Sequence, residues 1–146
     1  MPSNIAIIDY GMGNLNSVKR KLTRLNANAI ITSNPADIKK AAKIILPGVG
    51  HFGKAMTNLV DLNLIEVLNE KVLIKKKPIL GICLGMQLMA KSSEEGNSKG
   101  LGWFDGEVVK FKVQDTLKYK IPHTGWNQVT ILKESRLMKG IADLSE

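Results

Sequence analysis

The chain has 146 residues, of which 44% are hydrophobic and 23% charged, and its formal net charge is +8. This composition excludes a disordered, collagen-like or disulfide-scaffold protein and predicts one globular domain over residues 1–146. No apolar run approaches the roughly 18 residues of a membrane-spanning helix, so no membrane partner is expected. A single cysteine, and an N-terminus without a signal-peptide pattern, predict a cytoplasmic protein.

Short apolar runs alternate with helical patterns through the first 82 residues. Strands are predicted at residues 5–8, 29–32, 43–46 and 78–82, and helices at 15–25, 35–41 and 59–76. The last helix is predicted from the spacing of Leu62, Ile65, Leu68 and Val72. Such alternation indicates βαβ units, a mostly parallel sheet and helices on both of its faces.

The pattern changes towards the C-terminus. Residues 107–111 and 128–132 predict strands with no helix between them, which favours an antiparallel extension of the fold. Residues 92–100 are rich in Ser, Glu and Gly and predict one surface loop.

Basic residues gather at 19–24, 39–43 and 75–77, inside or beside helical patterns. No aromatic side chain lies within these clusters to stack on bases. We therefore interpret them as solvated helix faces and expect no nucleic-acid partner, a nucleic-acid-binding module being the weaker alternative.

The segment Gly81–Gly85 has the form glycine, any residue, nucleophile, any residue, glycine, between a predicted strand and a helical run. This is the context of a nucleophile elbow, in which Cys83 would sit on a strained turn between glycines. The N–H of Leu84 would then be placed to stabilise an oxyanion. The alternative is that Cys83 is a small buried core residue, the usual fate of a lone cysteine. The two glycines and the strand–helix context favour the nucleophile.

A second glycine-rich segment, residues 47–50, follows the third predicted strand. It could present backbone N–H groups to a developing negative charge, or it could be an ordinary turn. The Gly11 and Gly13 pair lacks the third glycine of a dinucleotide fingerprint, so no cofactor is predicted. The two histidines, His51 and His123, cannot form a metal site by their spacing, but either could be a general base.

Six segments taken together resemble the class I (triad-type) glutamine amidotransferases. More narrowly, they resemble the glutaminase subunits of imidazole glycerol phosphate synthase, the HisH family. The segments are residues 8–14, 46–52, 81–87, 94–96, 100–102 and 122–127. The resemblance implies a flavodoxin-like α/β fold and an activity that uses neither a cofactor nor a metal.

The same resemblance implies a mechanism and a set of site residues. Cys83 would attack the side-chain amide of glutamine, releasing ammonia and leaving a thioester that water hydrolyses. Backbone N–H groups of Val49 or Gly50, together with Leu84, would stabilise the oxyanion. Positions that match substrate-binding residues of the family are Gly48, Gln87 and Glu95.

The resemblance also implies a partner, a (β/α)8-barrel synthase subunit bound as a heterodimer. Ammonia would pass to it and give imidazole glycerol phosphate and AICAR in histidine biosynthesis. Gly11, Asn14 and Trp126 match positions near this partner. Two alternatives stay open: a subunit that feeds ammonia to a sugar amidotransferase in surface-polysaccharide synthesis, and a catalytically inactive subunit that only binds a partner.

One departure from the family pattern concerns the triad. The family carries its catalytic His and Glu in a Phe-His-Pro-Glu-like segment near the C-terminus, whereas here no histidine follows His123. We therefore expect the 146 residues to be an incomplete, truncated domain with little glutaminase activity of its own.

Overall fold

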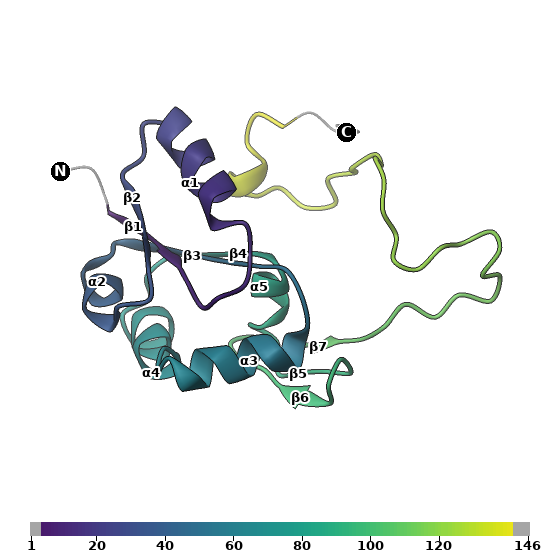
Figure 1. Cartoon of the computed structure of the whole chain (residues 1–146). Coiled ribbons are helices and arrows are strands. Elements are labelled where there is room, and N and C mark those ends of the chain that lie inside the picture. The colour runs from purple at the N-terminus through teal and green to yellow at the C-terminus, as the bar shows by residue number, and fades with distance from the viewer. Residues whose placement is uncertain (1–3, 142–146) are drawn as a thin grey trace. The chain divides into compact units, whose positions relative to one another are not determined.

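The computed structural model describes residues 4–141, and its contacts divide the chain into two units, residues 1–110 and 111–146. The first unit contains a four-stranded parallel sheet in the order β2-β1-β3-β4 (Figure 1). Its strands are β1 (Ile5–Ile8), β2 (Ala29–Thr32), β3 (Lys43–Gly48) and β4 (Ile79–Cys83). The predicted mostly parallel α/β sheet is confirmed, and the bounds of β1 and β2 agree with the prediction.

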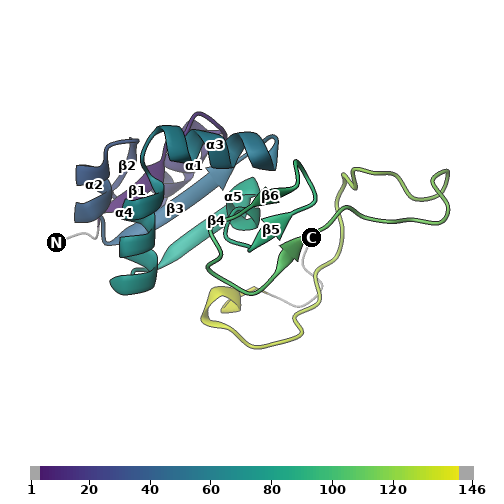
Figure 2. The same ribbon diagram turned by 90° about the horizontal axis from the view of Figure 1, so that it is seen from below.

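Helices lie on both faces of this sheet, as the alternating pattern predicts. Among the helices of the first unit, Figures 1 and 2 show α1 on one face and the others on the opposite face. The helices are α1 (Leu15–Arg24), α2 (Pro35–Lys40), α3 (Phe52–Asp61), α4 (Ile65–Asn69), the π-helix η1 (Glu70–Ile74) and α5 (Leu84–Gln87).

Two of the helices begin at asparagine caps. The Asn14 side chain accepts a hydrogen bond from the Ser17 N–H at 3.3 Å at the start of α1. The Asn34 side chain accepts one from the Ala36 N–H at 2.9 Å at the start of α2, where Pro35 also presets the helical φ angle.

The core follows the period-2 alternation of the strands. In β1, Ala6 and Ile8 belong to the large cluster packed with α2, α3 and α4, whereas Ile5 and Ile7 belong to a smaller cluster beneath α1. The continuous apolar run of β1 is therefore buried on both faces, as its sequence predicts.

The prediction of one helix over residues 59–76 is wrong. The structure begins α3 at Phe52 and ends it at Asp61, and α4 starts at Ile65. Between them Asn63 adopts a positive φ of 54°, a conformation that asparagine tolerates and that ends a helix. Leu62, counted on the apolar face in the prediction, is 41% exposed at this break.

Residues 92–108 form a small second sheet in place of a plain surface loop. Here β5 (Ser92–Ser93) pairs antiparallel with β6 (Ser98–Lys99) and parallel with β7 (Glu107–Val108). The strand predicted at 107–111 is thus shortened to two residues, and among the strands of residues 4–110 the antiparallel pair is β5 with β6.

The strand predicted at residues 128–132 is also wrong. Across residues 111–141 of the second unit, the only helix or strand longer than one residue is a 3-10 turn, η2 (Arg136–Met138). Val129 forms an isolated bridge, but Val129 and Leu132 are 46% and 92% exposed, so these two side chains gain little of the burial that stabilises a strand. Within residues 4–141, no helix combines the length and the apolar character needed to cross a membrane.

Candidate functional site

Cys83 occupies the sharp corner between β4 and α5. Its φ of 53° and ψ of −118° lie in a region that residues other than glycine rarely adopt, and its side chain is exposed. Such a conformation costs on the order of 1–3 kcal/mol and persists only where the surroundings impose it. The strand–turn–helix context that the sequence predicts for this motif is confirmed, and burial of Cys83 as a core residue is excluded.

The two glycines of the motif allow α5 to pack closely on the sheet. A Cβ atom at Gly81 would meet the backbone of Met86 in α5. A Cβ atom at Gly85 would collide with the carbonyl group of Leu46 in β3. These contacts explain why glycine stands two residues before and two residues after Cys83.

The second glycine segment lies directly beside Cys83. In the β3–β4 register Gly48 is the partner of Cys83, and the chain then continues into Val49–His51, which we call the glycine turn. Gly50 has a φ of 122° within this turn. The register therefore brings the predicted oxyanion donors next to the predicted nucleophile, at the carboxyl ends of parallel strands where such sheets bind ligands.

A cavity of about 590 Å³ opens at this edge. Five residues predicted from the sequence line it together, although they come from different elements. They are Gly50, Cys83, Leu84, Gln87 and Glu95. The remaining lining residues are Ser93, Glu94, Val108, Val109 and Lys110.

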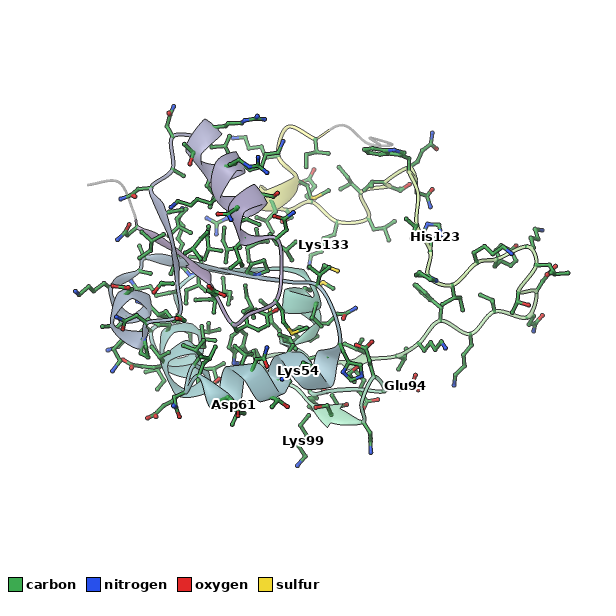
Figure 3. The ribbon with its side chains drawn as sticks, in the orientation of Figure 1. Lys54, Asp61, Glu94, Lys99, His123 and Lys133 are labelled. Carbon is green, nitrogen blue, oxygen red and sulfur yellow. The ribbon has the colours of Figure 1, made fainter. Side chains whose placement is uncertain are left out.

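Two adjacent glutamates form the polar wall of the cavity. The Glu95 carboxylate accepts a hydrogen bond of 2.7 Å from the N–H of Phe52, the first residue of α3. The Glu94 carboxylate accepts one of 2.8 Å from the N–H of Lys110. In Figure 3, Glu94 lies near the end of α3 opposite to Asp61. The wall is thus tied both to α3 and to the segment after β7.

The sequence did not predict Ser93, Val108, Val109 or Lys110 as site residues, and it placed Glu94 in the surface loop predicted at residues 92–100. These residues reach the cavity through the two-residue strands of the small sheet, where the Glu94 N–H donates to the Val108 carbonyl at 3.0 Å. Glu94 could have been predicted as a site residue, because it adjoins Glu95 in one of the segments that resemble the family.

Neither histidine is shown to act on Cys83. His51 caps α3, its Nδ1 accepting a hydrogen bond of 3.4 Å from the Lys54 N–H, and it does not line the cavity. His123 is an exposed residue of the second unit (Figure 3). Within the described part of the chain, the Cys83 thiol has no hydrogen-bond partner, and no three His, Cys, Asp or Glu side chains gather as a metal site would require.

The other predicted positions lie outside the cavity lining. Gly48 is buried against Tyr10 and α5, Gly11 donates its N–H to the Asp9 carboxylate at 3.1 Å, and Asn14 caps α1. In the second unit, Trp126 is 89% exposed. The partner role predicted for Gly11, Asn14 and Trp126 stays a prediction.

The chain is similar to known proteins over nearly its whole length. The family model described as glutamine amidotransferase class-I matches residues 6–146. Imidazole glycerol phosphate synthase subunit HisH 2 of Methanococcus maripaludis is 52% identical over 141 residues, which cover 97% of this chain and 69% of the relative. Subunit HisH 1 of Campylobacter jejuni is 52% identical over 143 residues, which cover 97% and 70%.

A solved structure supports the fold. The crystal structure of a glutamine amidotransferase matches with a TM-score of 0.63 and 18% identity, over 75% of this chain and 59% of that one. The chain thus spans about 70% of the length of these two relatives and less than two thirds of this solved structure. On the family match and the two HisH relatives, the chain belongs to the class-I glutamine amidotransferase family and, within it, to the HisH subunits of imidazole glycerol phosphate synthase.

Proposed function

We propose that this chain carries the nucleophile and the substrate pocket of a glutaminase that splits glutamine into glutamate and ammonia. The observation that carries the proposal is the exposed Cys83, held at positive φ on a corner between β4 and α5 and facing a cavity that also contains Gln87 and Glu95. A strained, accessible sulfur in a cavity that also carries polar side chains is an arrangement suited to thiol catalysis of acyl transfer.

The reaction proceeds in two balanced steps. The Cys83 sulfur bonds to the amide carbon of glutamine, the carbon–nitrogen bond breaks, and the nitrogen leaves with the thiol proton as ammonia. Water then adds to the thioester, the carbon–sulfur bond breaks, and glutamate and the free thiol result. Each step passes through an oxyanion, for which the N–H groups of Leu84 and of Val49 or Gly50 are the donors.

Glutamine is recognised at its amino-acid end by the polar wall of the cavity. The Glu95 carboxylate attracts the α-ammonium group, and Gln87 offers both a donor and an acceptor from α5. Gly48 acts indirectly, because the absence of a side chain lets the end of β3 pack against the Tyr10 hydroxyl and α5 beside the cavity.

The partner is a (β/α)8-barrel synthase subunit in the cytoplasm, bound near Gly11, Asn14 and Trp126. It consumes the ammonia to make imidazole glycerol phosphate and AICAR. An enclosed transfer is chemically useful because free ammonia is mostly protonated, and so not nucleophilic, near neutral pH.

The first experiment labels the nucleophile with a diazoketone analogue of glutamine, followed by mass spectrometry of the Cys83 peptide. We expect stoichiometric modification that excess glutamine suppresses and that Cys83→Ser abolishes. The matched analogue of asparagine, shorter by one methylene group, is the specificity control. An unmodified Cys83 would favour the inactive, partner-binding alternative.

The second experiment measures ammonia release and its use. We expect slow turnover by the 146-residue chain alone, because no base is placed on Cys83 within the described residues. Turnover in the presence of the barrel synthase and its activated ribonucleotide tests the histidine pathway. Ammonia transfer only to a sugar amidotransferase would assign the chain to surface-polysaccharide synthesis instead.

A further inference from the structure

The geometry points to Tyr10 as a positioning residue that holds the glycine turn, and with it the oxyanion donors, in place beside Cys83. The inference rests on the proposed function and adds to it a residue that does not line the cavity. The Tyr10 hydroxyl lies against Gly48, the residue that pairs with Cys83 in the sheet.

The Tyr10 side chain is fully buried, and its hydroxyl donates a hydrogen bond of 2.6 Å to the carbonyl of Pro47. Pro47 stands two residues before the glycine turn and has no N–H to contribute to the sheet. The hydroxyl also lies directly against Gly48, where a Cβ atom would collide with it. Tyr10 therefore fixes the last two residues of β3 before the chain enters the turn.

The chain on the far side of the turn is tied back to the same tyrosine. Asn58 of α3 donates its amide N–H to the backbone carbonyl of Tyr10 at 3.0 Å. The helix α3 begins immediately after the glycine turn. Tyr10 therefore bonds to the chain on both sides of the turn, through its hydroxyl to Pro47 before it and through its carbonyl to Asn58 after it. The Glu95 carboxylate adds a second anchor at Phe52.

Burial keeps the Tyr10 hydroxyl protonated, as a hydrogen-bond donor must be. Burial, and after it the negative charge of an ionised Cys83, raise the pKa of Tyr10 to about 12. The anchor is consequently intact over the whole range in which a glutaminase works.

Oxyanion donors act only when they lie within a few tenths of an ångström of the right place. Replacing Tyr10 by Phe keeps the buried ring and removes only the anchoring hydroxyl. The end of β3 then loses its hydrogen bond to Tyr10, which follows β1, while Cys83, the last residue of β4, keeps its place. The expected defect is therefore in stabilisation of the anion and not in the reactivity of the thiol.

The experiment compares two reactions of Cys83 in the 146-residue chain. A γ-nitrile analogue of glutamine adds to the sulfur and builds negative charge on its nitrogen, which the donors of the turn must stabilise. Iodoacetamide alkylates the same sulfur by displacement, which needs no such donors. We expect Tyr10→Phe to lower the ratio of the two rates about tenfold, as a partial loss of one donor does. Two control variants, Tyr119→Phe at an exposed tyrosine and Thr32→Val at a buried hydroxyl of β2, should leave the ratio unchanged.

Hydrogen–deuterium exchange of the peptide over residues 47–52 gives an independent readout. We expect exchange of this peptide to rise about tenfold in Tyr10→Phe, while peptides from β1 and β4 keep their protection. Equal loss of both reaction rates, an unchanged ratio, or unchanged exchange would overturn the role of Tyr10. Failure of the unmodified chain to react with the nitrile would instead count against the glutaminase site, and the exchange measurement would still decide the role of Tyr10.

Discussion

The two faces of the four-stranded sheet differ in how far they are covered, although the strands are apolar on both. On the face of α2, α3 and α4, Ile8, Ile44 and Leu46 are almost completely buried. On the face of α1, Leu80 and Ile82 of the edge strand β4 are 50% and 37% exposed. They line a groove of about 330 Å³ with residues of α1 and Ile45.

The candidate site is supported from the covered face. Tyr10 and Leu84 belong to the large cluster on that face, and Gly85 packs there against Leu46. The α1 face contributes nothing to the cavity that contains Cys83. The strained corner and its neighbouring turn thus rest on the closely packed face of the sheet.

The largest expected effect is a mutation in the covered layer. Leu46→Ala removes a fully buried side chain beneath Gly85 and should lower the free energy of unfolding by about 2–5 kcal/mol. Urea denaturation followed by far-UV circular dichroism measures this loss. A cost below about 1 kcal/mol would show that the two faces are packed alike.

A pH effect should also arise from the covered layer. Because the pKa of Tyr10 is raised from 10.0 to about 12, its stabilising contribution is complete below pH 10 and is lost as the pH rises towards 12. This linkage amounts to about 2–3 kcal/mol. The free energy of unfolding should fall between pH 9 and pH 12, and this fall should be smaller by this amount in Tyr10→Phe than in the unmodified chain. The control Tyr119→Phe should lose as much as the unmodified chain.

A smaller effect is expected from a buried cation at the end of α2. Lys71 is 5% exposed, and its ammonium group donates to the carbonyls of Lys39 and Ala41 at 2.8 and 2.6 Å. Lys71→Met keeps the aliphatic stem but leaves both carbonyls without this donor, which should cost about 1–2 kcal/mol. The exposed Lys99→Met is the matched control and should be close to neutral in the same urea titration.

The smallest effect is expected on the α1 face. Leu80→Ala makes the same chemical change as Leu46→Ala but at a half-exposed site, so it should cost less than about 1 kcal/mol. Unfolding is to be measured at two protein concentrations tenfold apart. A cost equal to that of Leu46→Ala, growing with concentration, would mean that another molecule covers this groove in solution.

Local patterns predicted those parts of the molecule that short-range physics determines. The apolar runs of β1 and β2 end at polar residues, and their bounds were predicted from the sequence. The glycines that flank Cys83 likewise predicted the sharp turn between β4 and α5, because only glycine permits α5 to approach β3 and β4 so closely.

Features that depend on distant partners were not predicted. The break at Asn63 interrupts a regular leucine spacing, and residues 128–132 contain a one-residue bridge at Val129 in place of the predicted strand. The cavity residues from Ser93 to Lys110 depend on pairings of two residues each, which carry no periodicity. The link between Tyr10 and Pro47 spans 37 positions and follows from sheet register alone.

The backbone angles at Cys83 have a consequence for the history of this position. Glycine would adopt a φ of 53° and a ψ of −118° with less strain, so the backbone at residue 83 favours a side chain that cannot perform chemistry. Selection for a reactive thiol must therefore oppose the preference of the backbone at residue 83 for glycine. In a lineage that no longer needs the thiol, residue 83 should drift to glycine, which would leave a more stable protein whose cavity lacks a nucleophile.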